Sequence, residues 1–311
     1  MAFVERSQEM TLGQLFQQYH DLYAKTRCAT ASEIKTNFTR YFGDWFPRRL
    51  SSIKKLDVQA RINSLAEGAH FHRANRAHDD LRAVFSWAIK QGVFEGKNPC
   101  VGIARFKTQS RERFITPEEF ESFMKALQSE KNTKLRDFFY LCLFTGARQS
   151  NVLAMRWEDI DFRLALWNIP KTKNGEAHTV PLTPLAMEVL QTRQNNKSIW
   201  VFPGTGESGH LVEPKAAWRR ILKVAKLQDL RMHDLRRTLG SYMAMSNQSL
   251  QIIGKALGHR SPTSTMVYAR LANDPVRSAM QAAQQQMLTA AGLVNLDNTV
   301  IPMRKSRKRT R

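Results

Sequence analysis

The chain has 311 residues, with 48 Lys and Arg against 27 Asp and Glu, which gives a formal net charge of +21. This length exceeds what one small core needs, so two domains are expected. The excess of positive charge is larger than solubility requires and indicates a polyanionic partner, with nucleic acid as the first choice.

The cysteines exclude two kinds of site. Cys28, Cys100 and Cys142 are far apart, odd in number and without Cys-x-x-Cys spacing, which argues against a disulfide framework and a zinc site and fits a reducing cytoplasm. The first ten residues lack the apolar core of a signal peptide. No apolar run approaches the roughly 20 residues that span a bilayer.

The first hundred residues are predicted to be helical, because their apolar residues recur at three- and four-residue steps. Helices are expected over Thr11–Tyr23, over Ala31–Phe42, through Ile62 and Leu65 with Ser51 or Ser52 as the cap, and over Ala74–Gln91 with Ile89 on the apolar face. His70, His72 and His78 lie close together in this region. No Cys or acidic cluster completes a metal site there, so they are interpreted as solvated or DNA-facing.

The segment Arg105–Arg113 is predicted to be an interdomain linker. Its sequence, RFKTQSRER, is polar and basic without regular apolar spacing, and it either lies against a phosphate backbone or is a solvated loop. The second domain is expected to begin at Thr116, where Thr-Pro-Glu-Glu forms a capping box with Pro at the first helical position. A central helix over Leu135–Phe144 then ends at Thr145-Gly146, which places Arg148 on a turn.

Residues 157–182 are predicted to form a small β-structure. Alternating apolar residues indicate one strand over Ile160–Ile169, and Asn174-Gly175 indicates a hairpin turn. The returning strand is expected over His178–Leu182. Helices resume after Thr183-Pro184 and continue to about Gln286, and one of them is expected to carry Tyr268.

The stretch from Met232 to Arg270 holds three groups suited to phosphodiester chemistry: the pair His233 and Arg236, the step Leu257-Gly258-His259, and Tyr268. Guanidinium binds phosphate oxygens bidentately, imidazole moves protons near neutral pH, and an activated tyrosine forms covalent intermediates. Each piece alone has an ordinary alternative: a polar helix face, a helix that ends at a left-handed Gly, or an amphipathic core residue.

Two upstream residues complete an ordered set, which consists of Arg148, Lys173, His233, Arg236, His259 and Tyr268. The motifs are Thr-Gly-x-Arg, a turn lysine before Val-Pro-Leu, His-x-Leu-Arg-Arg-Thr, Leu-Gly-His and a tyrosine nine residues later. Chance assembly of five ordered motifs is improbable. The chain resembles the tyrosine recombinase, or phage integrase, family, strongly over Thr116–Arg270 and more weakly over Thr11–Asn98.

The resemblance implies a mainly α fold with a small antiparallel β-sheet in the catalytic domain, and two lobes that close as a C-shaped clamp around duplex DNA. The expected parts are a helical core-binding domain (1–104), a basic linker (105–113), an integrase-type catalytic domain (114–286) and a basic C-terminal tail (287–311). The tail ends in RKSRKRTR and is expected to be disordered and to add DNA affinity electrostatically. No room is expected for the N-terminal arm-binding domain that many integrases carry.

The resemblance also implies a role for each residue. Tyr268 would be the nucleophile and form a 3′-phosphotyrosyl bond, which conserves the phosphodiester energy, so no ATP, metal or other cofactor is expected. Arg148 and Arg236 would bind the non-bridging oxygens and stabilise the transition state. His233 would act as general base or hydrogen-bond the phosphate, and His259 would donate a hydrogen bond to a phosphate oxygen.

Three points stay open within the resemblance. Lys173 would protonate the leaving 5′-oxygen, with Lys171 as the competing candidate and an ordinary turn lysine as the alternative. Asn151 stands where the family often has an acid, and would orient Arg148 more weakly. The other tyrosines are interpreted as residues of the N-terminal helices or as core, and they are Tyr19, Tyr23, Tyr41, Tyr140 and Tyr242.

The expected function is a site-specific DNA recombinase or integrase in the bacterial cytoplasm. It would bind double-stranded recombination sites, with an accessory DNA-bending or directionality factor as an optional partner. It would be a homo-tetramer on DNA and a monomer when free. The helix-favouring segment Ser278–Leu293 would dock on a neighbouring protomer, as in the family, or would be a frayed tail helix. The alternatives are a type IB topoisomerase and a non-catalytic DNA-binding protein on the same fold.

Overall fold

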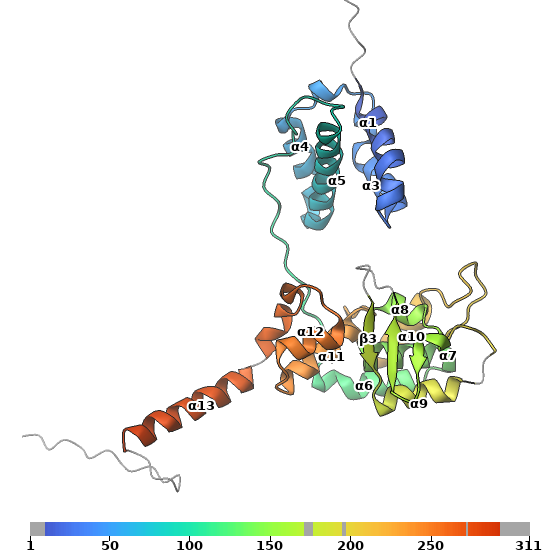
Figure 1. Cartoon of the computed structure of the whole chain (residues 1–311), viewed down its shortest axis with the longest axis vertical. Helices are drawn as coiled ribbons and strands as arrows, with labels where there is room; N and C mark the ends of the chain where they lie inside the picture. Colours follow the sequence, from blue (N-terminus) through green and yellow to red (C-terminus); the bar gives the residue numbers. More distant parts are fainter. Residues whose placement is uncertain (1–9, 171–176, 195–196, 272, 293–311) are drawn as a thin grey trace, which may run out of the picture. The chain divides into compact units, whose positions relative to one another are not determined.

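The computed structural model describes residues 10–170, 177–194, 197–271 and 273–292 (Figure 1). It divides into two compact units, unit 1 over Met1–Ser110 and unit 2 over Arg111–Arg311. The fold is mainly α with a three-stranded antiparallel sheet in unit 2, as the sequence predicts. Within these residues, no helix combines the length and the apolar character that a membrane crossing requires.

Unit 1 is a bundle of helices around α5. Its helices are α1 (Leu12–Tyr19), α2 (Lys25–Arg27), α3 (Ala31–Phe42), α4 (Lys55–Ala66) and α5 (Phe71–Lys90), with a π-helical turn η1 (His20–Ala24) and the 3-10 turns η2 (Gly43–Trp45), η3 (Leu50–Ser52) and η4 (Glu67–Ala69). α5 packs against α1, α3 and α4. Phe16 and Phe38 stack with their ring centroids 4.0 Å apart, which joins α1 to α3 in the core.

Three details of unit 1 differ from the prediction. Ser51 and Ser52 lie in η3 and do not cap α4; its N-cap is Lys54, whose backbone N–H donates to Asp57 at 3.0 Å. Leu22 is 69 % exposed, because the π-helical turn interrupts the 3.6-residue period. Ile89 is 39 % exposed because it lies in the last turn of α5, at the edge of the bundle.

The clustered histidines do not share one environment. His78 is buried and its Nε2 lies 3.2 Å from the carbonyl oxygen of Cys100, so the prediction of a solvated or DNA-facing side chain is wrong for this residue. His70 and His72 are exposed. Across the described part of the chain, no three His, Cys, Asp or Glu side chains are grouped as a metal site requires.

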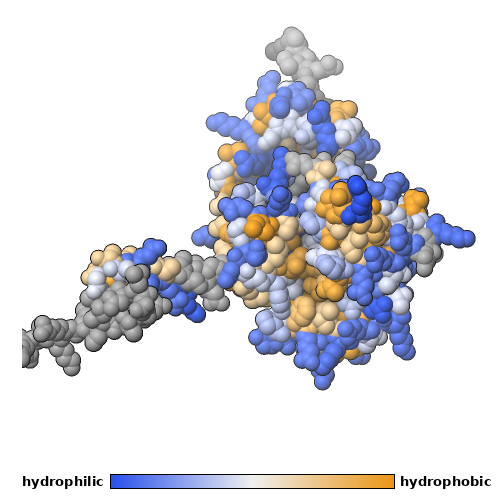
Figure 2. All heavy atoms as spheres, turned by 60° about the horizontal axis from the view of Figure 1, so that its bottom comes forward, coloured by the Kyte–Doolittle hydropathy of each residue, from blue (hydrophilic) through white to orange (hydrophobic). Residues whose placement is uncertain are grey.

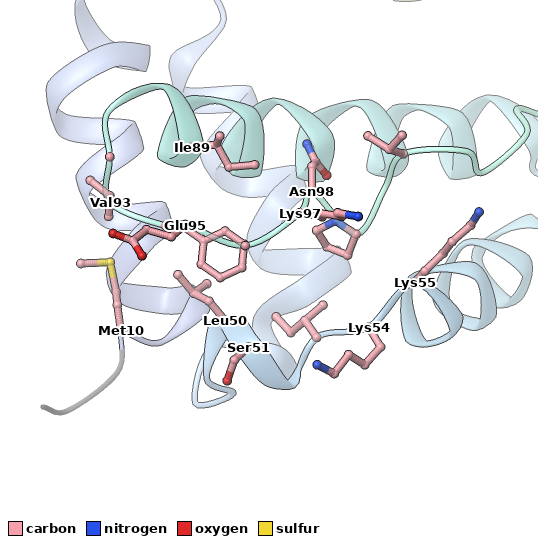
Figure 3. A pocket seen from close by; sticks show the side chains of 16 residues that line it. Met10, Leu50, Ser51, Lys54, Lys55, Ile89, Val93, Glu95, Lys97 and Asn98 are labelled. Carbon is pink, nitrogen blue, oxygen red and sulfur yellow. The ribbon is translucent and has the colours of Figure 1, made fainter. Parts of the chain in front are cut away.

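A groove on unit 1 lies between the end of α5, the loop after it and η3 (Figure 3). Its lining is mixed: Leu50, Val93 and Met10 contribute apolar surface, while Lys54 and Lys97 contribute ammonium groups. None of the sequence-predicted site residues lines this groove. The candidate chemistry therefore lies elsewhere, in unit 2.

Unit 2 is organised around α7. Its helices are α6 (Pro117–Gln128), α7 (Thr133–Thr145), α8 (Gln149–Leu153), α9 (Pro184–Arg193), α10 (Lys215–Ala225), α11 (Asp234–Met245), α12 (Leu250–Leu257) and α13 (Asn273–Ala290), with the 3-10 turns η5 (Trp157–Asp159), η6 (Pro262–Ser264) and η7 (Met266–Leu271). α7 contacts α6, α8, α9 and α11, and it buries Phe138, Phe139 and Leu141. Burial on several sides explains why its sequence is apolar on nearly all sides.

The predicted capping box at the start of unit 2 is confirmed. The backbone N–H of Thr116 donates to the Glu119 carboxylate at 3.1 Å, and Pro117 occupies the first helical position. The box fixes where α6 begins. Just before the box, Ile115 donates its N–H to Thr238 Oγ1 at 3.0 Å, and this separate bond ties the segment after the linker to α11.

The sheet has the order β1 (Ile160–Asp161), β2 (Leu166–Ile169), β3 (His178–Pro181), all antiparallel, with Ile169 opposite His178. The prediction of one continuous strand over Ile160–Ile169 is wrong. The Asp161 carboxylate accepts hydrogen bonds from the backbone N–H groups of Arg163 and Leu164 at 2.9 and 2.8 Å. This Asx-type turn splits the stretch into two strands.

Figure 2 shows the face that is turned towards the bottom of Figure 1, and on this face hydrophobic residues gather in patches among hydrophilic ones. In unit 2, an apolar hollow lies between α6, α7, α9 and α11 and is lined by Phe120, Phe144, Leu185, Leu239 and Tyr242. Tyr140 and Tyr242 are half-buried against the core of unit 2. Both are therefore packing residues, as predicted.

Candidate active site

Two left-handed glycine turns bring the sequence motifs together. α7 ends at Gly146 (φ +60°) and α12 ends at Gly258 (φ +63°), in a backbone conformation that glycine adopts without strain. A Cβ on Gly146 would lie only 2.7 Å from Leu257 Cδ2, so the two turns pack directly on each other. Arg148 follows the first turn, and His259 follows the second.

Arg236, on the first turns of α11, joins these two glycine turns. Its Nη1 donates to the carbonyl oxygen of Gly146 at 2.7 Å, and its Nη2 donates to that of Leu257. The side chain is buried, and burial first and then Arg148 lower its pKa to about 10. The guanidinium is still charged at neutral pH, and its remaining N–H groups are available to an anion.

Arg148 is half-buried beside Arg236, close enough that each influences the charge of the site. Its backbone begins α8, with the carbonyl accepting from Asn151 N at 2.8 Å. Within the described residues, neither Asn151 nor any acid accepts a hydrogen bond from its guanidinium. Two like charges are therefore held together without a carboxylate, an arrangement that an incoming phosphate would stabilise.

His259 lies at the start of the loop after α12. Its Nδ1 is 2.8 Å from Oγ1 of the buried Thr265. Burial first, and then Arg236 and Arg148, lower its pKa to about 4. The ring is therefore neutral at pH 7, and the contact with Thr265 fixes the imidazole orientation.

Tyr268 lies in η7 and is 4 % exposed. Its ring lies parallel to His259, with centroids 6.4 Å apart, and presses against α11 where Gly240 has no side chain. Burial raises its pKa, and the nearby Arg236 and Arg237 oppose that rise. The hydroxyl is thus protonated at neutral pH, and the side chain as a whole is almost fully buried.

His233 occupies the N-cap position of α11 without a side-chain capping hydrogen bond, and it is exposed to solvent. Partial burial first, and then the neighbouring Arg237 and Arg236, lower its pKa below the usual value. A neutral imidazole at the mouth of the site can accept a proton. Arg148, His233, Arg236, His259 and Tyr268 therefore lie together, and we call this group the Arg236 pocket.

Lys171 and Lys173 lie outside the described residues, so the general-acid prediction has no structural test. What the structure does describe is the pairing on either side of them. β2 ends at Ile169 and β3 begins at His178, and these two residues are partners in the sheet. The two strand ends that flank residues 171–176 are thus paired with each other.

A second group, absent from the sequence-based set, lies beside the Arg236 pocket. The Asp234 carboxylate is fully buried and accepts from Arg111 Nη2 at 2.8 Å, from Arg237 Nη1 at 2.7 Å and from the backbone N–H of Arg231 at 2.8 Å. Arg111 also pairs with Asp229 at 2.9 Å. These residues form the Asp234 cluster, and their contacts hold the pKa of Asp234 below its usual value despite burial.

The sequence contains only a partial signal for this cluster. An acid directly after His233 suits the first turn of a helix, but its partner Arg111 is 123 positions upstream. His178 and Thr265 are likewise separated in sequence from the residues that they contact. His178, on β3, contacts Gly258, and Thr265, directly after η6, contacts His259. Spacing along the chain cannot reveal such partners.

The chain matches the model of the phage integrase family over residues 113–274, just over half of its length. Among curated relatives, it is 27 % identical over 236 residues to prophage integrase IntF of Escherichia coli K12, covering 70 % of this chain and 50 % of the relative. It is 34 % identical over 191 residues to the shufflon-specific DNA recombinase of Escherichia coli, covering 61 % and 48 %. The chain thus spans about half the length of these relatives.

Solved structures share the fold. The Tn1549 transposon integrase in complex with transposon right end DNA superposes with a TM-score of 0.73 at 20 % identity, covering 88 % of this chain and all of that one. A lambda integrase dimer bound to a COC′ core site gives a TM-score of 0.66 at 20 % identity, covering 82 % and 97 %. Together with the family match, these likenesses show that the chain belongs to the phage integrase family of tyrosine recombinases.

Proposed function

We propose that this protein is a site-specific DNA recombinase that cuts and rejoins DNA through a 3′-phosphotyrosyl bond on Tyr268. The observation that carries the proposal is the Arg236 pocket. There, two guanidinium groups with no carboxylate partner in the described part of the chain lie beside a tyrosine and two neutral imidazoles. Such a site attracts a phosphodiester and stabilises the extra charge of its transition state. The relatives named as integrases and DNA recombinases support the same reaction.

In the proposed cleavage step, the Tyr268 oxygen attacks phosphorus, and its proton passes to His233. Arg148 and the free N–H groups of Arg236 bind the non-bridging oxygens, while His259 donates a hydrogen bond to one of them. The bond from phosphorus to the 5′-oxygen breaks, and a lysine between β2 and β3, Lys173 or Lys171, supplies the proton to the leaving oxygen. The reverse sequence rejoins a strand without ATP.

The proposed partner is duplex DNA, and the proposed assembly is a tetramer on two recombination sites formed from free monomers. A lambda integrase tetramer bound to a Holliday junction has the same fold, with a TM-score of 0.65 at 19 % identity. The C-shaped clamp and docking of the segment 278–293 on a neighbour belong to this proposal. Sedimentation with and without site DNA tests it, and a complex that stays monomeric on recombining sites would contradict it.

Covalent trapping tests the reaction. The wild type, Tyr268→Phe and Tyr242→Phe are incubated in EDTA with nicked suicide substrates from DNA that flanks the gene, and an SDS-resistant protein–DNA band is sought. The wild type and Tyr242→Phe are expected to form the band and Tyr268→Phe is not. A band that survives in Tyr268→Phe would exclude this nucleophile.

Two further results would favour the alternatives. Tight site binding by the wild type without any covalent band, in the presence of a cell extract as a source of accessory factors, would favour a non-catalytic DNA-binding protein. Relaxation of supercoiled DNA without site preference would favour a type IB topoisomerase.

A further inference from the structure

His178 is an imidazole at the edge of the Arg236 pocket that the proposed mechanism does not use. It is the first residue of β3 and is half-buried. The ring atoms Cδ2, Nε2 and Cε1 lie 2.8, 2.9 and 3.0 Å from the place where a Cβ on Gly258 would stand. The side chain also hydrogen-bonds the backbone of Ala256 and is close enough to Arg236 and Arg148 to feel their charge.

The segment that His178 contacts carries two groups of the site. The carbonyl oxygen of Leu257 accepts from Arg236, and His259 follows one residue after Gly258. A displacement of this turn would move the acceptor of the arginine and the imidazole of His259 together. The contacts of His178 at Ala256 and Gly258 lie on either side of Leu257, so they hold the turn at two points.

We propose that His178 is a positioning residue of the recombinase site, which holds the Ala256–His259 turn in place so that Arg236 and His259 meet the phosphate in the correct geometry. The inference rests on the proposed function for its catalytic consequence. His178 acts through the turn and does not itself touch the reacting atoms.

The chemistry of the position explains why histidine suits it. The flat ring fits against the bare Cα of Gly258, where a branched side chain would collide with the turn. Its N–H can donate to a backbone carbonyl, and burial lowers its pKa, which keeps the ring neutral. A lysine or arginine here would add a third positive charge beside Arg148 and Arg236. Gly258 is therefore constrained twice, by its positive φ and by the ring that covers it.

The first test separates binding from catalysis. Single-turnover cleavage of a suicide substrate and DNA affinity are measured for His178→Ala, His178→Gln and the control His210→Gln. His210 is a half-buried histidine of unit 2 that bonds the carbonyl of Leu211 and packs on Trp200, away from the pocket. His178→Ala is expected to lose roughly 10- to 100-fold in cleavage rate at saturating DNA with unchanged affinity, as for a misplaced catalytic group.

Rescue and spectroscopy distinguish positioning from general packing. His178→Gln, whose amide reaches the region of Nε2, is expected to recover part of the rate, and His210→Gln to match the wild type. In histidine-labelled protein without DNA, the His259 resonances, assigned with His259→Asn, are expected to move in the two His178 variants and not in His210→Gln. The NMR readout does not depend on cleavage, so it tests the position of His259 even if the wild type never forms a covalent complex. Failure of the proposed function can therefore be told apart from failure of this inference.

Two results would overturn the inference. The first is a cleavage rate in both His178 variants equal to that of the wild type, together with an unmoved His259. The second is a loss of thermal stability and DNA affinity in proportion to the loss of rate, which would mean that His178 only packs β3 against α12. If His178→Ala does not fold, the comparison of His178→Gln with His210→Gln still decides.

Discussion

Asp234 and Arg236 lie two residues apart on α11, and both carry a buried charge. Groups of opposite charge surround the first, whereas a group of like charge lies beside the second. The Asp234 carboxylate is surrounded by Arg111, Arg237 and a backbone N–H. Arg236 is also buried, but its partners among the described residues are two backbone carbonyls, and another arginine, Arg148, lies beside it. The helix thus carries a neutralised charge and an uncompensated one side by side.

The difference indicates which charge is structural and which is functional. A buried carboxylate with several charge-assisted partners holds segments together, and removal of one partner is costly. Burial of a cation without an acidic partner lowers its pKa, and a bound anion would stabilise the charged form. We therefore expect changes in the Asp234 cluster to act mainly on stability, and changes in the Arg236 pocket to act mainly on cleavage.

The largest expected effect comes from the pocket. Arg236→Lys and Arg236→Ala should lower the cleavage rate by roughly 10³-fold or more, since one residue supplies several donors to the transition state and each is worth about 10²–10³. Lysine keeps the charge but lacks the planar fork of donors with which arginine spans two separate carbonyls and still binds a phosphate. Single-turnover cleavage at saturating DNA measures this. An Arg236→Lys variant with wild-type rate would show that the charge alone suffices.

The next effect comes from the cluster. Asp234→Asn should reduce the free energy of unfolding by about 3 kcal/mol, because Arg111 and Arg237 lose a fully buried partner. Asp229→Asn is the control: this carboxylate pairs with the same Arg111 but is 73 % exposed, so a change of about 0–1 kcal/mol is expected. Urea unfolding measures both. An equal loss of unfolding free energy in the two variants would mean that the buried carboxylate of Asp234 stabilises the fold no more than the exposed one of Asp229.

The sequence predicts the two regions unequally. The motifs around Arg148, His233, Arg236, His259 and Tyr268 are short and ordered along the chain, and the structure places these residues together. The helices with regular apolar spacing are also predicted well, as α3 shows with its bounds at Ala31 and Phe42. The Asp234 cluster is missed because it depends on Arg111, whose distance in sequence gives no pattern.

The other misses have local causes that spacing cannot encode. Alternating apolar residues over Ile160–Ile169 predict one strand, but a single carboxylate, Asp161, bonds two backbone N–H groups and turns the chain. The helix expected around Tyr268 is the 3-10 turn η7. The sequence predicts His78 to be a polar surface residue, but the side chain is buried in the core next to the carbonyl oxygen of Cys100.

A glycine variant should separate placement of the nucleophile from stability. A Cβ on Gly240 would come within 2.5 Å of the Tyr268 ring, so Gly240→Ala should displace the ring and slow cleavage by about 10- to 100-fold. Gly43→Ala in unit 1 is the control, because its Cβ would meet only Thr39 at 3.8 Å. The yield of covalent protein–DNA complex and the cleavage rate are compared between the two variants. A Gly240→Ala variant that cleaves normally would show that Tyr268 does not need this contact.

The two regions should also lose their stabilising effects at different pH. The folded pKa of His259 is about 4 against an ordinary value of 6.5, so the unfolded chain binds the proton first and stability falls from about pH 6.5 down to about pH 4. The pKa of Asp234 is below its ordinary 3.8, so its contribution is lost only under more acidic conditions. Urea unfolding from pH 7 to pH 4 should therefore show a slope that His259→Asn reduces and Asp234→Asn leaves in place. A slope unchanged by His259→Asn would contradict this assignment.

The smallest expected effect concerns the contact between the linker end and the nucleophile segment. Glu112 follows Arg111 of the Asp234 cluster, and it pairs with Arg270, two residues after Tyr268; Arg270 Nη2 also donates to the Glu112 carbonyl at 3.0 Å. Because the pair is exposed, its coupling should be about 0–1 kcal/mol, or at most roughly fivefold in rate. Glu112→Arg and Arg270→Glu should each change the cleavage rate by this much, and the double variant should restore it. Failure of the swapped pair to restore the rate, with DNA affinity matched among the variants, would mean that the Asp234 cluster and the segment of Tyr268 are not coupled through this contact.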